Sequence, residues 1–223
     1  MSAGALESGV GAVLERFRRA SGHTVTVEWG TAPQLAARMS RGQPADVLVA
    51  PTVVVDQAAG RGQIVTGSRV VVGRIGVGVM VGTDAPPPDV SSEAALRRTL
   101  LSAEAIVYSQ GSSGQSIDAM FARLGIAAQL EARVLRLADA DDVVKRVAEG
   151  TARDLGFGAI TAITRSERLG IRYVAPLPES LQNFTTYEAA VRTGAREPQV
   201  ASALLQFMAT PAARRALSES GVE

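Results

Sequence analysis

Two hydrophobic periods alternate along the chain and predict a mixed α/β protein. Apolar residues three and four apart predict helices, whereas strict alternation or short apolar runs predict strands. Helices are predicted at 5–20, 31–41, 52–60, 92–101, 115–124, 139–149, 197–209 and 211–219. Strands are predicted at 24–29, 46–50, 69–82, 105–108, 133–136, 155–159, 172–175 and 185–191. Such alternation is typical of mainly parallel sheets flanked by helices on both faces.

Two of the predicted strands suggest a division into two lobes. The segment 69–82 is almost entirely Val, Ile and Gly, which is too rich in glycine for a helix and reads as one long, bent strand. Together with the later strand near 184–191 it forms the natural crossing between lobes. We therefore expect lobe 1 to contain residues 1–80 plus 190–223, and lobe 2 to contain residues 81–189.

Composition excludes several classes of function. The 223 residues carry 23 cationic and 22 anionic side chains, so no charge excess attracts nucleic acid or an anionic membrane. Aromatic residues make up only 4% of the chain, which disfavours platforms that stack bases. No apolar run reaches the roughly 20 residues of a membrane-spanning helix. We expect a monomer with no nucleic-acid partner and no direct membrane insertion.

The chemistry available to the chain is narrow. It has no cysteine and one histidine, His23, which excludes disulfides, thiolate catalysis and histidine-rich metal sites. We expect no metal, no cofactor and no catalytic residue. The carboxylates at Asp46 and at Asp141-Asp142 fit a turn and a solvated helix face. His23 follows Gly22 in a turn and is expected to be exposed.

Three small polar clusters lie where ligands bind in parallel sheets, beyond strand ends and at helix N-termini. They are Ser2-Ala3-Gly4, Gly30-Thr31-Ala32 and the run from Ser109 to Gly114, expected as a loop. Each alone fits a capped strand-to-helix turn, but three together indicate a shared anion site. The third is not a P-loop, because no lysine lies near it.

Two arginines extend this list of candidates. Arg69 and Arg74 lie in or beside the apolar crossing segment, where a buried guanidinium needs a partner. That partner is either a carboxylate of the protein or an anionic ligand, and the sequence leaves both open.

Four stretches together resemble the molybdate-binding branch of the type II periplasmic solute-binding proteins. They are Ser2-Ala3-Gly4-Ala5-Leu6, Gly42-Gln43-Pro44-Ala45-Asp46-Val47, Leu155-Gly156-Phe157 and Phe207-Met208-Ala209-Thr210-Pro211-Ala212-Ala213. The resemblance implies two α/β lobes with a ligand cleft between them, in which hydroxyls and backbone amides hold a tetrahedral oxyanion. The contacts it implies are Ser2, Ala3, Thr31, Ala32, Ser112, Ser113 and Gly114. We expect five further ligand contacts, at Gly4, Arg69, Arg74, Phe157 and Tyr187.

The chain also departs from that branch. Phe157 begins the stretch where the molybdate binders have a tyrosine, and Arg69 and Arg74 together with Tyr187 resemble a divergent subgroup related to aconitate isomerases. The resemblance therefore implies a binding protein for a small anion, oxyanion or carboxylate, that serves an ABC transporter permease. An aconitate-type isomerase is the alternative, with Tyr187, Tyr108 or a carboxylate moving the proton. A cytoplasmic ligand sensor is a third reading.

The same resemblance bears on the start of the chain. No signal peptide is visible in the sequence, and the first strand that the resemblance implies directly before Ser2 is expected to be absent. The resemblance implies a periplasmic protein, and a genuine start at Met1 implies a cytoplasmic one. With that start we expect a weakened lobe 1 and a loosely held Ser2.

Overall fold

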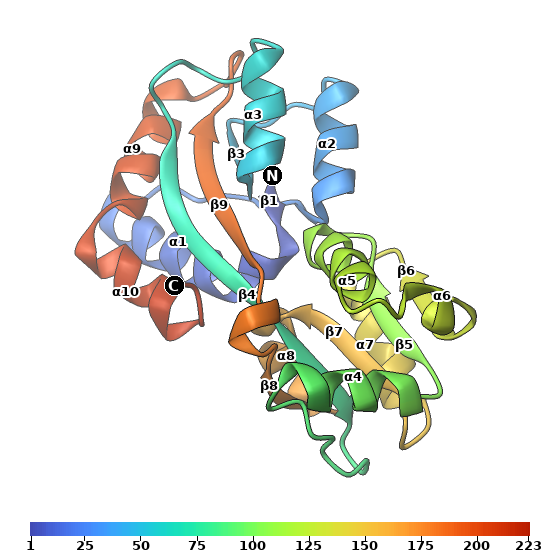
Figure 1. The fold of residues 1–223 in the computed structure, drawn as a ribbon. Helices are drawn as coiled ribbons and strands as arrows, with labels where there is room; N and C mark the ends of the chain where they lie inside the picture. The colour runs from blue at the N-terminus through green and yellow to red at the C-terminus, as the bar shows by residue number, and fades with distance from the viewer. The chain divides into compact units, whose positions relative to one another are not determined.

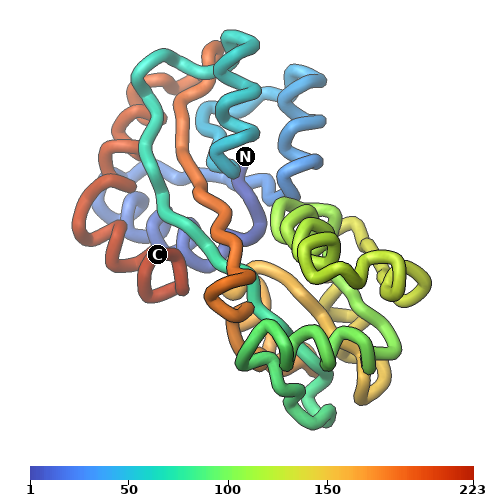
Figure 2. The backbone as a smooth tube through the Cα atoms, viewed as in Figure 1, coloured from blue at the N-terminus to red at the C-terminus, as the bar shows by residue number.

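The computed structural model describes residues 1–223, which divide into two compact units. Unit 1 comprises Met1–Ile75 and Thr185–Glu223, and unit 2 comprises Gly76–Phe184. The chain enters unit 2 along β4 (Val70–Gly82) and returns at the start of β9 (Phe184–Val191), as Figures 1 and 2 show. The crossings fall at 75/76 and 184/185, whereas the sequence placed them at 80/81 and 189/190.

Unit 1 contains a mixed sheet with helices on both faces. Its strands lie in the order β2-β1-β3-β9-β4. The first three are β1 (Ser2–Ala3), β2 (Trp29–Gly30) and β3 (Val47–Pro51). β1 is parallel to both of its neighbours, and β9 is antiparallel to β3. Two helices pack together on one side and three on the other (Figure 1). They are α2 (Ala32–Ser40) and α3 (Thr52–Gly60), then α1 (Glu7–Ser21), α9 (Pro198–Met208) and α10 (Pro211–Glu219).

Unit 2 repeats this plan around the second half of β4. β4 pairs antiparallel with β7 and β8, while β5 is parallel to β6 and β7. The strands are β5 (Ile106–Ser109), β6 (Val134–Leu137), β7 (Leu155–Ala159) and β8 (Ile171–Pro176). The helices are α4 (Glu93–Ser102), α5 (Ser112–Arg123), α6 (Ala127–Leu130), α7 (Ala140–Ala148) and α8 (Ile160–Ser166). Short 3-10 turns lie at Gly4–Leu6, Glu131–Arg133, Glu167–Leu169 and Glu179–Leu181. The predicted α/β class with helix-flanked sheets is confirmed.

The alternation of β4 explains how its second half is buried on both faces. Val77, Val79 and Val81 belong to the cluster that contains the apolar side chains of α4 and α5. Met80 lies in the other cluster, with Val143 and further side chains of α7 and α8. Because successive side chains point to opposite faces, one apolar run supplies both layers of the core.

The local differences from the sequence prediction have physical causes. Of the predicted strand 24–29 only Trp29 forms a strand, together with Gly30 just beyond it, because β1 offers just two residues, Ser2 and Ala3, for pairing. Ser112, Ser113 and Gly114 form the first turn of α5 instead of a loop. The short helices α6 and α8 carry too few turns to establish a helical period in the sequence, and they were missed.

The expectations for Ser2 were wrong. Ser2 and Ala3 are themselves the strand β1, and Ser2 is only 2% exposed. Its amide donates to the Glu28 carbonyl at 3.0 Å, and the Val49 amide donates to the Met1 carbonyl at 3.0 Å. Hydrogen bonds to strands on both sides therefore hold this segment firmly in the sheet.

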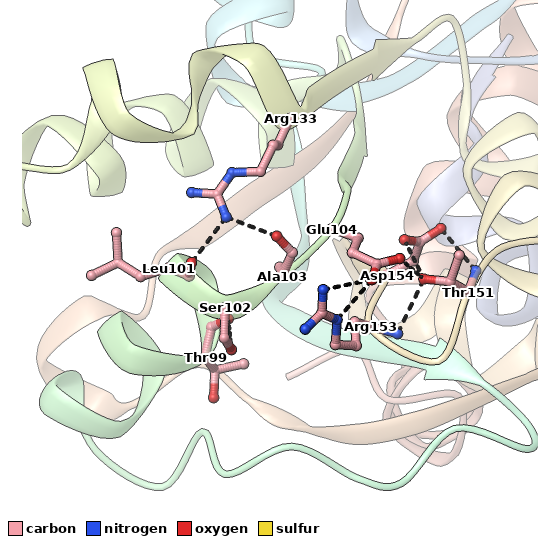
Figure 3. Close-up of polar contacts among 9 residues, drawn as sticks. All are labelled: Thr99, Leu101, Ser102, Ala103, Glu104, Arg133, Thr151, Arg153 and Asp154. Atoms are coloured by element: carbon pink, nitrogen blue, oxygen red, sulfur yellow. Dashed lines mark hydrogen bonds and ion pairs between the residues drawn. The ribbon is translucent and has the colours of Figure 1, made fainter.

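A polar network ties together the amino ends of β5 and β7 in unit 2 (Figure 3). Glu104 bonds the Arg153 guanidinium at 2.6 Å and accepts from the Thr151 hydroxyl at 2.8 Å. Asp154, 1% exposed, accepts from the Thr151 hydroxyl at 3.0 Å and pairs with Arg146 at 2.7 Å. Nearby, Arg133 donates to the carbonyls of Leu101 and Ala103 at the C-terminal end of α4.

Candidate functional site

Two of the predicted clusters are neighbours in unit 1. The strands β1, β2 and β3 are parallel, so their carboxyl ends lie at one edge of the sheet. Ala3 is paired with Gly30, and a Cβ placed on Gly4 would be 4.0 Å from the Gly30 carbonyl oxygen. The structure therefore brings Ser2, Ala3 and Gly4 together with Thr31 and Ala32. The Ser2 hydroxyl oxygen is buried and has no hydrogen-bond partner in the protein.

The N-terminus of α2 is partly capped by its own side chains. The Thr31 amide donates to Gln34 Oε1 at 2.8 Å, and the Gln34 amide donates to Thr31 Oγ1 at 3.5 Å, which together form a capping box. Pro33 has no N–H, so the Ala32 amide is the donor that this turn leaves without a partner inside the helix.

Sequence reasoning missed a cation beside this turn. Arg38 Nη1 donates to the Trp29 carbonyl at 2.8 Å and lies 3.1 Å from where a Cβ on Gly30 would be. The absence of a side chain at Gly30 permits this approach. The sequence spacing could have revealed it. Arg38 follows Thr31 by seven residues, about two helical turns, so both lie on the same face of the helix.

A third helix N-terminus lies at the same edge, at the start of the predicted helix 52–60, and it is not among the polar clusters predicted from the sequence. β3 runs directly into α3, whose first residue is Thr52 and whose N-cap is Pro51. The Thr52 hydroxyl lies 3.3 Å from Glu188 Oε1. The Glu188 side chain is only 12% exposed and comes from β9, opposite Ala50. Unit 1 thus adds one carboxylate at this edge.

Protein carboxylates partner both arginines of the crossing segment. Arg69 Nε lies 2.6 Å from Glu188 Oε2, and its Nη2 lies 2.7 Å from Asp56 Oδ1. These hydrogen bonds, to Glu188 first and to Asp56 second, raise the pKa of Arg69. Arg74 pairs with Glu223 at 3.1 Å and has a side chain that is 54% exposed. The expectation that these guanidinium groups are buried was wrong.

In unit 2 the predicted contacts Ser112, Ser113 and Gly114 open α5 at the carboxyl end of β5. The N-cap is Gly111, and no side chain caps this end. The first amides of the helix therefore lack partners within it, and the helix dipole adds positive potential there. A Cβ on Gly114 would lie 1.8 Å from the Ser109 carbonyl oxygen, so only glycine permits this close turn.

The Tyr108 ring packs against that turn, and its hydroxyl is hydrogen-bonded within the protein. Its hydroxyl donates to Asp118 Oδ1 at 2.5 Å, and Arg136 Nη2 donates to the same oxygen at 2.8 Å. Burial, followed by the hydrogen bond to Asp118, raises the pKa of Tyr108 far above its ordinary value. The phenol proton is therefore directed to the Asp118 carboxylate.

The structure buries the two remaining predicted contacts. Phe157 is 1% exposed and its ring belongs to the core between the sheet and α5, so its side chain is not available to a solute. Tyr187 is buried in β9 opposite Pro51, at the same edge of unit 1 as the polar turns. No three acidic or histidine side chains gather closely enough to hold a metal ion. No helix is long and apolar enough to cross a membrane.

These features agree with the family to which the chain belongs. The family model described as bacterial extracellular solute-binding protein matches residues 1–223, so this chain is a member of that family. Members of such a family bind a small solute. The chain is also 29% identical over 229 residues to an aconitate isomerase from a Pseudomonas species, an alignment that covers 100% of this chain and 86% of the relative.

Solved structures share the fold. The periplasmic molybdate-binding protein of Azotobacter vinelandii superposes with a TM-score of 0.79 at 18% identity, covering 100% of this chain and 96% of that one. Campylobacter jejuni PEB3 bound to L-phospholactate gives a TM-score of 0.73 at 13% identity, covering 99% and 96%. At these identities the similarity shows the two-lobed binding-protein fold and no more.

Proposed function

We propose that this protein binds a small anion through the polar turns at the strand ends of its two units. The observation that carries the proposal is the convergence in unit 1 of Ser2–Gly4 and Gly30–Ala32 at one sheet edge, with Arg38 beside them. In unit 2, taken by itself, the uncapped first turn of α5 offers donors of the same kind. Amides at helix N-termini and hydroxyls are the donors that proteins use for oxyanions and carboxylates.

These turns carry few cationic groups, which favours an anion of low charge such as an oxyanion or a small carboxylate. Arg69 is neutralised by two carboxylates, which removes it from the proposed binding groups. Arg38 keeps most of its donors, because the Trp29 carbonyl accepts from only one of its five N–H groups. A guanidinium prefers the planar fork of a carboxylate, while neutral amides and hydroxyls suit a tetrahedral oxyanion equally well.

The family also suggests how the bound solute is used. Extracellular solute-binding proteins are the capture components of membrane transporters, so we propose that an ABC permease receives the anion from this protein outside the cytoplasm. The solute would leave the protein without chemical change.

A thermal-shift screen tests this function. Molybdate, tungstate, sulfate, phosphate, citrate and cis-aconitate are added one at a time, and at least one should raise Tm. A ligand present at 100 times its Kd stabilises by about 2.7 kcal/mol, which is several degrees for a protein of this size. Trp29 is the single tryptophan and is paired with Ser2, so its fluorescence should respond to the same anion.

Matched variants locate the site. Ser112→Ala should weaken binding of that anion, and Arg38→Ala should weaken a carboxylate more than an oxyanion. Ser202→Ala, which removes a hydroxyl bonded to a backbone carbonyl in α9, should leave affinity unchanged. A screen in which no anion raises Tm contradicts the proposed function.

The aconitate isomerase relative supports a second candidate, an isomerase that moves a proton on a tricarboxylate. The Tyr108 hydroxyl is already hydrogen-bonded to Asp118. Glu188 is the carboxylate at the unit 1 edge, although Arg69 holds it at 2.6 Å. Conversion of cis- to trans-aconitate, followed by ultraviolet absorbance, should be lost in Glu188→Gln. Absence of turnover in the unmodified protein leaves the binding function alone.

A further inference from the structure

A chain of hydrogen bonds inside unit 2 links the first turn of α5 to the segment by which the chain leaves the unit. The Ser116 hydroxyl donates to the Ser112 carbonyl at 3.1 Å, and Asn183 Nδ2 donates to that hydroxyl oxygen at 2.5 Å. Asn183 immediately precedes Phe184, the last residue of unit 2. The turn proposed to bind the anion is thus bonded, through one hydroxyl, to the returning segment.

The preceding residue, Gln182, extends this chain of hydrogen bonds to the entering strand β4. The Val77 amide donates to Gln182 Oε1 at 2.8 Å, and Gln182 Nε2 donates to the Val77 carbonyl at 3.0 Å. The Asn183 amide donates to the same Oε1 at 3.0 Å. These three bonds fix the orientation of the Gln182 amide, because one end only accepts and the other only donates. Val77 follows Gly76, the first residue of unit 2.

The packing at Gly76 shows how closely the two segments approach each other. A Cβ placed on Gly76 would lie 3.2 Å from both Gln182 Cδ and Phe184 Cε1. The entering strand is therefore in contact with the returning segment at the residues where the chain passes between units. Both segments are tied to each other and, through Asn183 and Ser116, to α5.

We propose that Asn183 is a positioning residue for anion binding, acting through Ser116 on the first turn of α5 and through Gln182 on β4. In this role Asn183 acts through its neighbours and not by contacting the solute. It holds the Ser116 hydroxyl against the Ser112 carbonyl, which fixes the turn whose amides receive the anion. This inference rests on the proposed function. It adds that anion binding at the turn is coupled to the conformational order of two segments, β4 near Val77 and the returning segment 182–184. Such coupling is reciprocal, so each should stabilise the other.

The variants Asn183→Ala, Ser116→Ala and their combination form a double-mutant cycle. The anion that gives the largest rise in Tm among molybdate, phosphate and cis-aconitate is the probe, and its Kd is measured by calorimetry. One lost neutral hydrogen bond corresponds to about a 3- to 10-fold increase in Kd. The double variant should lose no more than either single variant, because both break the same chain. Ser116→Thr keeps the hydroxyl and should restore affinity.

Hydrogen exchange in the absence of any anion tests the coupling separately. Asn183→Ala should speed exchange of the Val77 amide and of the Gln115 amide, which donates to Gly111 in the first turn of α5. The amide of Leu155, bonded to Ala105 elsewhere in the unit, should not change and serves as the internal control. The anion should slow exchange at Val77 in the unmodified protein and do so less in Asn183→Ala.

The possible failures are distinguishable. If no anion binds, the proposed function fails, and the exchange experiment without anion still decides the coupling. Unchanged exchange at both Val77 and Gln115 in Asn183→Ala overturns the inference whatever the binding result. Losses of affinity that add up in the double variant overturn it as well, because Asn183 and Ser116 would then act independently.

Discussion

The two ends of the sheet in unit 2 differ in how far their polar groups are satisfied by partners within the protein. At the amino end, Glu104, Thr151 and Asp154 each meet at least one charged or hydroxyl partner (Figure 3). At the carboxyl end, the first turn of α5 has no capping side chain. Both ends combine hydroxyl side chains with a tight glycine, Gly150 at the amino end and Gly114 at the carboxyl end, so these residue types alone do not distinguish them.

The difference shows which polar cluster serves the fold and which can serve a ligand. Buried polar groups cost free energy unless they are hydrogen-bonded, so a network that satisfies itself has no need of a solute. Donors that the protein leaves open are satisfied by water or by a ligand. Unit 1 repeats the contrast, since Arg69 is held by two carboxylates while Arg38 donates to one carbonyl.

The largest expected effect comes from adding one methyl group at the carboxyl end of this sheet, in the uncapped first turn of α5. We call this the open end and the amino end, where the polar groups bond one another, the closed end. Gly114→Ala would place a Cβ 1.8 Å from the Ser109 carbonyl oxygen, so the turn must move or the helix must begin later. We expect stability to fall by about 3 kcal/mol and anion affinity to be lost. Urea unfolding and calorimetry measure the two effects.

Gly11→Ala is the matched control for this change. Gly11 lies in α1 with nothing within 4 Å of its added Cβ, and alanine favours helices by about 1 kcal/mol over glycine. The control should be neutral or slightly stabilising and should bind normally. If Gly114→Ala binds the anion as well as the control does, the open turn is not the binding site.

The next effect tests the closed end. Asp154→Ala removes a buried carboxylate that pairs with Arg146 at 2.7 Å and accepts from the Thr151 amide at 3.1 Å. We expect a loss of about 2–3 kcal/mol, less than for a fully buried pair because Arg146 is partly exposed. Affinity for the anion should stay unchanged. A loss of affinity without a loss of stability would show that the closed end serves binding and not the fold.

The sequence predicted the fold well because periodicity records burial. The long strand at 69–82 and the helices before and after it were recognisable, since apolar spacing reflects which face is covered. Strand length was less predictable. Residues 24–29 have the alternation of a strand, yet the ladder covers only Trp29 and Gly30, because pairing depends on the partner β1.

The candidate site was predictable only in part. Clusters at strand ends can be read from small polar residues before a helix, and the structure places Ala3 and Gly30 side by side. Partners distant in sequence could not be read. Glu188, one of the two carboxylates that pair with Arg69, lies 119 residues away, and the burial of Phe157 depends on helices from other segments.

A smaller effect is expected from the cap of α4. Arg133 donates to the carbonyls of Leu101 at 2.9 Å and Ala103 at 2.8 Å, which satisfies acceptors that a helix end leaves open (Figure 3). Arg133→Ala should cost about 1 kcal/mol, measured by urea unfolding. Arg133→Lys should recover only part of this loss, because a single ammonium cannot also replace the bond from Nη2 to the Gln129 carbonyl at 3.1 Å. Full recovery by lysine would show that charge alone matters here.

The smallest effect is a dependence on pH at the closed end. The Thr151 hydroxyl, and then Arg153, hold the pKa of Glu104 below its ordinary value. A carboxyl with a lowered folded pKa adds stability above its unfolded pKa and loses it as pH falls through the folded pKa. The unmodified protein should therefore melt slightly above Glu104→Gln at pH 7, and the gap should close between about pH 5 and pH 3. A gap that stays constant over this range would mean that the Glu104 carboxylate adds nothing to the network by its charge, and the closed end would then depend on Asp154 alone.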